Sequence, residues 1–162
     1  MPSQAFQIQP YTGPSELEQV RALFTEYASS LEIDLCFQNF EAELAGLPGA
    51  YAPPRGSLML AWSQRELVGC CALRPLDAVD YPNACEMKRL YVRPALRGSG
   101  LGRRLAEAVM ETGQQTGYTY MLLDTLSEME TARAMYQDLG FTEVPPYYYN
   151  PIEGAHYLMA RL

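Results

Sequence analysis

Residues 85–113 decide the fold, and they read Cys-Glu-Met-Lys-Arg-Leu-Tyr-Val-Arg-Pro-Ala-Leu-Arg-Gly-Ser-Gly-Leu-Gly-Arg-Arg-Leu-Ala-Glu-Ala-Val-Met-Glu-Thr-Gly. The β-prone side chains of Met87 and of residues 90–92 predict a strand. Pro94 ends it, because proline has no backbone N–H to donate and restrains the residue before it. From Leu101 onward, apolar residues recur at helical spacing. The stretch therefore predicts a strand and a helix joined by a turn that contains Gly98, Gly100 and Gly102.

The glycine turn has the properties of an anion site. Glycine permits positive φ and a close approach of ligand to backbone, and the first amides of a helix have no intrahelical partner. Half of the chain's twelve Lys and Arg residues lie in this stretch, although the formal net charge is −7. Arg103 and Arg104 fall in the first helical turn, where each cation costs roughly 0.3–1 kcal/mol. A bound polyanion would reverse this cost, so we favour a phosphate-bearing ligand over a glycine-rich connector with solvated arginines.

Three segments together resemble a known family. Arg97-x-x-Gly100-x-Gly102 is similar to the Arg/Gln-x-x-Gly-x-Gly/Ala signature of the GNAT superfamily of N-acetyltransferases. Residues 86–92 resemble the family's central strand, and residues 131–141 resemble its segment ending in Tyr-x-x-x-Gly-Phe. A single Gly-x-Gly would be weak evidence, whereas three segments in order over about residues 57–162 are specific. Other glycine motifs fit less well, because no Gly-Lys-Ser/Thr follows and the dinucleotide pattern requires glycine where Leu105 stands.

The pattern of the whole chain predicts the order β-α-α-β-β-β-α-β-α-β-β. The expected strands are residues 6–9, 57–62, 67–74, 85–92, 120–126, 141–144 and 157–162, and the expected helices begin near residues 14, 38, 101 and 128. Alternation in the second half favours an α/β sheet with a parallel pair beside the glycine turn. The resemblance implies the GNAT acyl-CoA N-acyltransferase fold, an α/β (α+β) fold. Its mixed, strongly twisted sheet has about seven strands and four helices, and the strands at 85–92 and 120–126 splay apart to admit the cofactor.

Composition limits the class of protein. A chain of 162 residues, 48% hydrophobic and 19% charged, is expected to form one packed domain over residues 1–162. A pI near 4.7 argues against a nucleic-acid partner. The four cysteines and one histidine show no metal-ligand spacing, so we expect no metal and reduced thiols in a cytoplasmic protein. We expect no membrane partner, since no leader or long apolar run is present, and exposed strand edges leave a homodimer open.

The resemblance implies acetyl-CoA as the cofactor, with CoA as the product. Its pyrophosphate would bind the amides of residues 98–103, flanked by Arg97, and charge-assisted bonds of this kind are strong. Its pantetheine arm would pair with the backbone of residues 90–92 as an added strand does. The expected cofactor-binding residues are Leu90, Tyr91, Val92, Arg97, Gly98, Ser99, Gly100, Leu101, Gly102 and Arg103.

Two residues are candidates for catalysis. An acceptor amine with a pKa near 10 must lose a proton before it attacks, and Glu86 is the candidate base, directly or through a water. An ion-paired glutamate, with Lys88 on the same strand face, is the other interpretation, and both stay open. The resemblance places Tyr136 opposite the thioester sulfur, where its hydroxyl would protonate the leaving thiolate. A core tyrosine at helical spacing is the alternative.

Candidate acceptor-binding residues come from three segments. An acidic group at Asp34 would hold an amine, and Asp124, which interrupts an apolar strand, is a second base or an amine anchor that must be solvated or partnered. Tyr148, Tyr149 and Asn150 belong to a loop bounded by prolines, where rings could contact an amine through cation–π interactions, although surface tyrosines without a ligand are equally compatible. For the aromatic and apolar residues of the early helices, core packing is favoured over lining the site: Tyr27, Leu31, Phe37 and Phe40.

Three functions follow from these residues. The first is transfer of an acetyl group from acetyl-CoA to a primary amine of a small molecule or amino acid, by direct attack in a ternary complex. The alternatives are a protein or peptide N-acetyltransferase and a catalytically silent acyl-CoA-binding regulatory module. The presence of Glu86, Gly100, Gly102 and Tyr136 favours an enzyme, and no basic tail indicates a chromatin or ribosome target.

Overall fold

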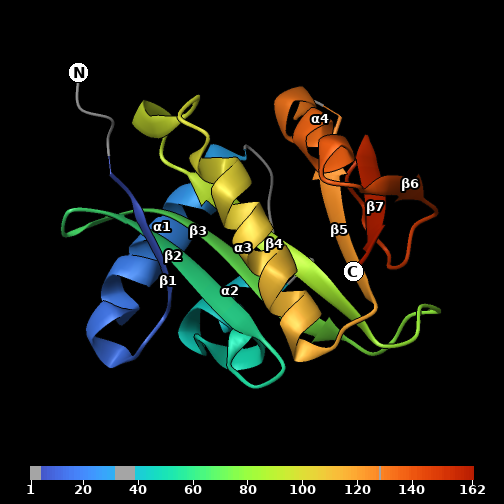
Figure 1. The fold of residues 1–162 in the computed structure, drawn as a ribbon, viewed down its shortest axis with the longest axis horizontal. Helices are drawn as coiled ribbons and strands as arrows, with labels where there is room; N and C mark the ends of the chain where they lie inside the picture. Colours follow the sequence, from blue (N-terminus) through green and yellow to red (C-terminus); the bar gives the residue numbers. More distant parts are fainter. Residues whose placement is uncertain (1–4, 32–38, 128) are drawn as a thin grey trace.

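The structure is a computed structural model that describes residues 5–31, 39–127 and 129–162. Within these residues, seven strands and four α-helices follow one another in the predicted order (Figure 1). The strands form one mixed sheet in the order β1-β2-β3-β4-β5-β7-β6. Their bounds are β1 (Gln7–Pro10), α1 (Leu17–Ser30), α2 (Phe40–Ala45), β2 (Ser57–Ser63), β3 (Glu66–Leu76), β4 (Ala84–Val92), α3 (Leu101–Thr116), β5 (Tyr120–Leu126), α4 (Glu130–Asp138), β6 (Thr142–Val144) and β7 (Ala155–Arg161).

Each face of the sheet has its own hydrophobic core. Successive residues of a strand point to opposite faces, so Cys71 and Leu73 of β3 pack with α3, whereas Cys70 and Ala72 pack on the side of α1. The α3 face also receives Tyr136 of α4. The opposite face buries one side of α1 and the start of α2, through Val20, Leu23, Phe24 and Phe40. Figure 1 shows α3 lying across the sheet. In the described part of the chain, no helix combines the length and apolar character needed to cross a bilayer.

The parallel pairing of β4 and β5 is short. It joins Ala84 to Tyr120, Cys85 to Met121 and Glu86 to Leu122, and then ends, although β4 continues to Val92 and β5 to Leu126. Beyond Glu86 the two strands therefore separate, as expected from the resemblance. Their facing backbone edges become available to a ligand.

A β-bulge lies in β4 just beyond this point. Cys70 of β3 pairs with Tyr91 and Ala72 pairs with Lys88, so a single β3 residue faces two β4 residues, Arg89 and Leu90. Arg89 has φ 60°, in the left-handed region, which costs a non-glycine residue roughly 1–2 kcal/mol. Because a bulge bends its strand, this one turns the end of β4 where the pairing with β5 has stopped.

Candidate active site

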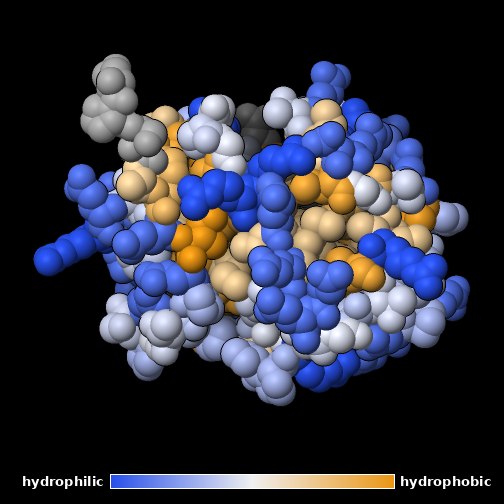
Figure 2. All heavy atoms as spheres, in the orientation of Figure 1, coloured by the Kyte–Doolittle hydropathy of each residue, from blue (hydrophilic) through white to orange (hydrophobic). Residues whose placement is uncertain are grey.

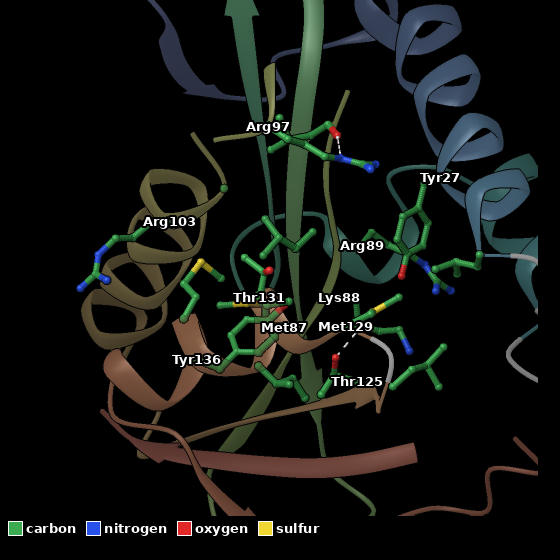
Figure 3. A pocket seen from close by; sticks show the side chains of 18 of the residues that line it. Tyr27, Met87, Lys88, Arg89, Arg97, Arg103, Thr125, Met129, Thr131 and Tyr136 are labelled. Carbon is green, nitrogen blue, oxygen red and sulfur yellow. Dashed lines mark hydrogen bonds between the residues drawn. The ribbon is translucent and has the colours of Figure 1, made fainter. Parts of the chain in front are cut away.

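A cleft of about 820 Å³ opens where β4 and β5 separate. Its lining comes from both strands, the start of α3, and α4 (Figure 3). Met87, Leu123 and Tyr136 reach it from the α3 face of the sheet, where they share a core cluster. Lys88 and Asp124 are their strand neighbours and so point to the α1 face. The cleft therefore gives access to both faces of the sheet at one point.

The start of α3 forms one end of the cleft. Gly98 and Gly100 have φ 84° and 85°, and the first helical bond runs from the Arg104 amide to the Gly100 carbonyl at 3.1 Å. The amides before Arg104 thus have no helical acceptor. A Cβ on Gly98 or Gly100 would meet no atom within 4 Å, so backbone conformation and open space, not crowding, make glycine suitable here. This cradle fits a diphosphate.

Most of the predicted cofactor-binding residues line this cleft. They are Leu90, Val92, Arg97, Gly98, Gly100, Leu101, Gly102 and Arg103. The Arg97 Nε donates to the Val92 carbonyl at 3.2 Å, and its guanidinium lies 5.7 Å from the centre of the Tyr91 ring. Tyr91 and Ser99 are not among the lining residues: the Tyr91 hydroxyl donates to Glu26 Oε2 at 2.8 Å, and the Ser99 hydroxyl donates to the Leu96 carbonyl at 2.6 Å.

The side chain of Arg103 does not point into the cleft. It extends away from it (Figure 3) and forms ion pairs with Glu107 at 3.2 Å and Asp138 at 2.5 Å. These carboxylates offset the cost of a cation at a helix N-terminus. The positive charge of Arg103 is offset within the protein, so its side chain does not require a bound anion, contrary to the sequence-based expectation. Its backbone amide remains at the start of α3.

Tyr136 lies on α4 and lines the cleft (Figure 3). The residue is 7% exposed, and its ring packs edge-on against Phe141 with 5.7 Å between centres. Burial is the main cause that raises the pKa of its hydroxyl above the ordinary value. The hydroxyl therefore stays protonated at neutral pH and can donate a hydrogen bond or a proton. Both the core and the functional interpretation of this residue agree with its place.

Glu86 is fully buried at the last pair between β4 and β5. Its Oε1 accepts from Arg74 Nε at 2.7 Å, and its Oε2 accepts from the Tyr147 hydroxyl at 2.6 Å. Lys88 Nζ lies 3.9 Å from Oε1. Glu86 is thus ion-paired, with Arg74 as its nearer partner, and is not among the residues that line the cleft. Its role as the catalytic base stays a prediction. Because Glu86 is buried, a proton from the acceptor amine would have to reach it through another group or a water.

The structure brings together three of the predicted acceptor residues. Asp124 Oδ2 accepts from the Tyr148 hydroxyl at 2.5 Å and from Asn150 Nδ2 at 3.2 Å. Asp124 and Asn150 line the cleft, so the aspartate in the apolar strand is both partnered and reachable. Tyr149 is 83% exposed and is not among the lining residues. Asp34 lies outside the described residues.

The early helices also contribute side chains to the wall of the cleft. Tyr27 and Leu31 line the cleft, whereas Phe40 is buried in the core of the α1 face. Phe37 lies outside the described residues. The residues at the end of α1 therefore line the cleft, whereas Phe40 at the start of α2 packs in the core.

Sequence reasoning did not assign Lys88 and Arg89 to the site. Lys88, the single lysine of the chain, lines the cleft with a side chain that is 5% exposed, and burial lowers its pKa. Arg89 forms two hydrogen bonds with Glu43, Nε to Oε2 at 2.9 Å and Nη2 to Oε1 at 3.0 Å, and its guanidinium lies 5.3 Å from the centre of the Phe40 ring. Side chains alternate between the two faces of a strand, so Lys88 lies on the same face as Glu86. That spacing is the sequence signal that could have identified Lys88 as a site residue.

His156 also has partners that the sequence did not reveal. Its Nε2 lies 2.7 Å from Ser127 Oγ, and its Nδ1 lies 2.7 Å from Glu143 Oε1. Such a row resembles the hydrogen bonding of a serine hydrolase, but none of the three residues lines the cleft. The Ser127 amide donates to the Gly154 carbonyl at 2.9 Å and so does not serve as an oxyanion donor. The row connects the ends of β5, β6 and β7.

An open mixed sheet, with a splayed parallel pair beside a glycine turn, defines the acyl-CoA N-acyltransferase class of fold. Solved structures share it over nearly the whole chain. An acetyltransferase from Streptococcus agalactiae has a TM-score of 0.79 at 22% identity, covering 98% of this chain and 99% of its own. A Salmonella typhimurium protein, solved with its cofactor acetyl-CoA, has a TM-score of 0.69 at 16% identity, covering 97% and 94%.

The family is established by sequence. The acetyltransferase (GNAT) family model matches residues 17–141. An uncharacterized N-acetyltransferase of Schizosaccharomyces pombe is 38% identical over 146 residues, which cover 90% of this chain and 88% of that protein. The chain belongs to the GNAT family of acetyltransferases, which use acetyl-CoA, and both the predicted family and the predicted fold are confirmed.

Proposed function

We propose that this chain transfers the acetyl group of acetyl-CoA to a primary amine of a small molecule or amino acid, by direct attack while both substrates are bound. The observation that supports this most is the cleft itself. It joins the helix start that fits a diphosphate to Tyr136 on one sheet face and Asp124 on the other. Two ligands approaching from opposite faces would meet where β4 and β5 separate.

The residues at the cleft suit acetyl-CoA, which supplies an activated acetyl thioester. The amides at the start of α3 would hold its diphosphate, with Arg97 beside them. The β4 edge from Leu90 to Val92, unpaired with β5, offers backbone groups to the extended arm. The Val92 carbonyl already accepts from Arg97, so that hydrogen bond helps to define the edge.

In the transfer, a bond forms between the amine nitrogen and the acetyl carbon, and the carbon–sulfur bond breaks. One proton leaves the nitrogen, and one is added to the sulfur. Tyr136 is suited to the second task because burial keeps its hydroxyl protonated. The same apolar surroundings disfavour a free thiolate, so a proton donor at this point lowers the barrier.

Removal of the amine proton is assigned to the α1 face. Asp124 lines the cleft and would hold the incoming ammonium. Glu86 would accept the proton through the Tyr147 hydroxyl, which it binds at 2.6 Å, or through a water. This route agrees with the complete burial of Glu86.

Two measurements test the function. The first is CoA binding by calorimetry, and the second is thiol release from acetyl-CoA with a panel of amino acids, polyamines, aminoglycosides and short peptides. We expect CoA to bind and small amines to release thiol faster than peptides do. Faster release with peptides would favour the protein acetyltransferase, and CoA binding without release for any acceptor would favour the silent module.

A further inference from the structure

We infer that the acceptor carries a carboxylate next to its amine, as an α-amino acid does, with Lys88 binding the carboxylate and Asp124 binding the ammonium. This inference rests on the proposed function and narrows its substrate. It concerns the α1 face of the cleft, opposite Tyr136.

The two charged residues occupy matching positions on facing strands. The last parallel pair joins Glu86 to Leu122, and two residues further along each strand stand Lys88 and Asp124. A shift of two residues restores the same face of a strand, and both residues line the cleft. Figure 3 shows the Lys88 side chain among those around the pocket. A cation on β4 and a carboxylate on β5 thus stand on either side of the opening.

The neighbouring charges are arranged in close pairs. Arg74 lies 2.7 Å from Glu86, and Arg89 lies 2.9 Å from Glu43. The contact from Lys88 to Glu86 is longer, 3.9 Å, and both Glu86 oxygens already accept shorter hydrogen bonds. Lys88 has contacts within the protein as well, and both Lys88 and Asp124 line the cleft.

The two charges at the opening favour a zwitterion. Lys88 on β4 and Asp124 on β5 have opposite charges and both line the cleft. An amino acid offers an ammonium to the carboxylate and a carboxylate to the lysine. A simple ammonium at Asp124 would bring a second cation toward Lys88 with no carboxylate to offset it.

The donors and acceptors also match. Both hydrogen bonds to Asp124 end on Oδ2. Neither of these donors uses its Oδ1, so that oxygen can accept from a ligand ammonium. An ammonium such as that of Lys88 has three donors and can bind a carboxylate in addition to its contacts with the protein. Held at both ends, the amine would lie at the opening that leads to Tyr136.

The test compares three acceptors that differ only at the carboxylate: an α-amino acid, its carboxamide and the corresponding decarboxylated amine, each with an aliphatic and an aromatic side chain. We expect kcat/KM, measured by thiol release, to be roughly 10- to 150-fold higher for the amino acid, the range for one hydrogen bond to a charged group. Lys88→Met should bring this ratio close to one, and Lys88→Arg should retain most of it. Asp124→Asn should slow all three acceptors.

A binding measurement separates this inference from the proposed function. Calorimetry on CoA-saturated protein should detect the amino acid but not the decarboxylated amine, and Lys88→Met, checked for folding by urea denaturation, should lose that binding. Equal rates and equal binding for the two ligands would overturn the inference while leaving acetyl transfer intact. If no acceptor released thiol, the proposed function would fail, and selective amino acid binding that depends on Lys88 would still support the site. Absence of binding in that case would refute both.

Discussion

The Arg89–Glu43 pair allows a quantitative test of what holds the bulge of β4 against α2. The Arg89 side chain is 2% exposed and that of Glu43 is 16% exposed, and two hydrogen bonds join them. Arg89→Met keeps an unbranched side chain at the same positive φ, so backbone strain is similar in both proteins. The substitution removes the buried cation from the Glu43 carboxylate, together with the contact between the guanidinium and the Phe40 ring.

Breaking a buried pair by removing one partner costs about 3–5 kcal/mol, because the remaining charge is left uncompensated. Glu43 retains some exposure and can turn toward water, so we expect the lower end, about 3 kcal/mol of unfolding free energy. For a domain of this size the melting temperature should fall by roughly 6–12 °C. Adding Glu43→Leu to Arg89→Met removes the stranded carboxylate and should recover part of the loss.

Urea denaturation followed by circular dichroism measures these free energies. Arg55→Met is the matched control, since Arg55 and Asp77 form an ion pair with side chains 57% and 71% exposed, and its urea midpoint should not change measurably. A cost below about 1 kcal/mol for Arg89→Met would contradict a stabilising role of the buried pair. A further loss of stability on adding Glu43→Leu to Arg89→Met would contradict it as well.

Three other predictions concern the cleft and the core. Tyr136→Phe should lower kcat for acetyl transfer while the Kd for CoA stays constant, and an unchanged kcat would remove the proposed acid. Gly100→Ala and Gly117→Ala each place a side chain at positive φ, 85° and 103°, without a steric contact. Both substitutions should destabilise the fold by about 1 kcal/mol. Only Gly100→Ala should weaken CoA binding in calorimetry. Equal CoA affinities for the two variants would exclude the start of α3 as the diphosphate site. Burial raises the pKa of the Cys70, Cys71 and Cys85 thiols, to about 12 for Cys70 and Cys85. All three thiols therefore stay protonated at pH 8. In a Cys36→Ser background a disulfide reagent should therefore label only unfolded protein, and labelling of the native form would contradict the burial of Cys70, Cys71 and Cys85.

The sequence alone determined the order of elements and the family. The strand at residues 120–126 was predicted with the bounds that β5 has, because it is a continuous apolar run between clear boundaries. Helix ends were less accurate: α2 is Phe40–Ala45 rather than 38–47, and α4 is Glu130–Asp138 rather than 128–139. Apolar periodicity locates the middle of a helix, whereas its ends depend on local backbone bonding and packing.

Tertiary structure decided which side chains meet in the site. Asp124 and Tyr148 were each predicted to bind the acceptor, but only the packing of the loop against β5 joins them in one hydrogen-bonded group. Arg74 reaches Glu86 because the antiparallel register places them opposite each other. The spacing of residues along the chain does not show which residues of two neighbouring strands lie opposite each other. The face that each side chain of β4 and β5 presents to the cleft depends on that register and on where the pairing stops.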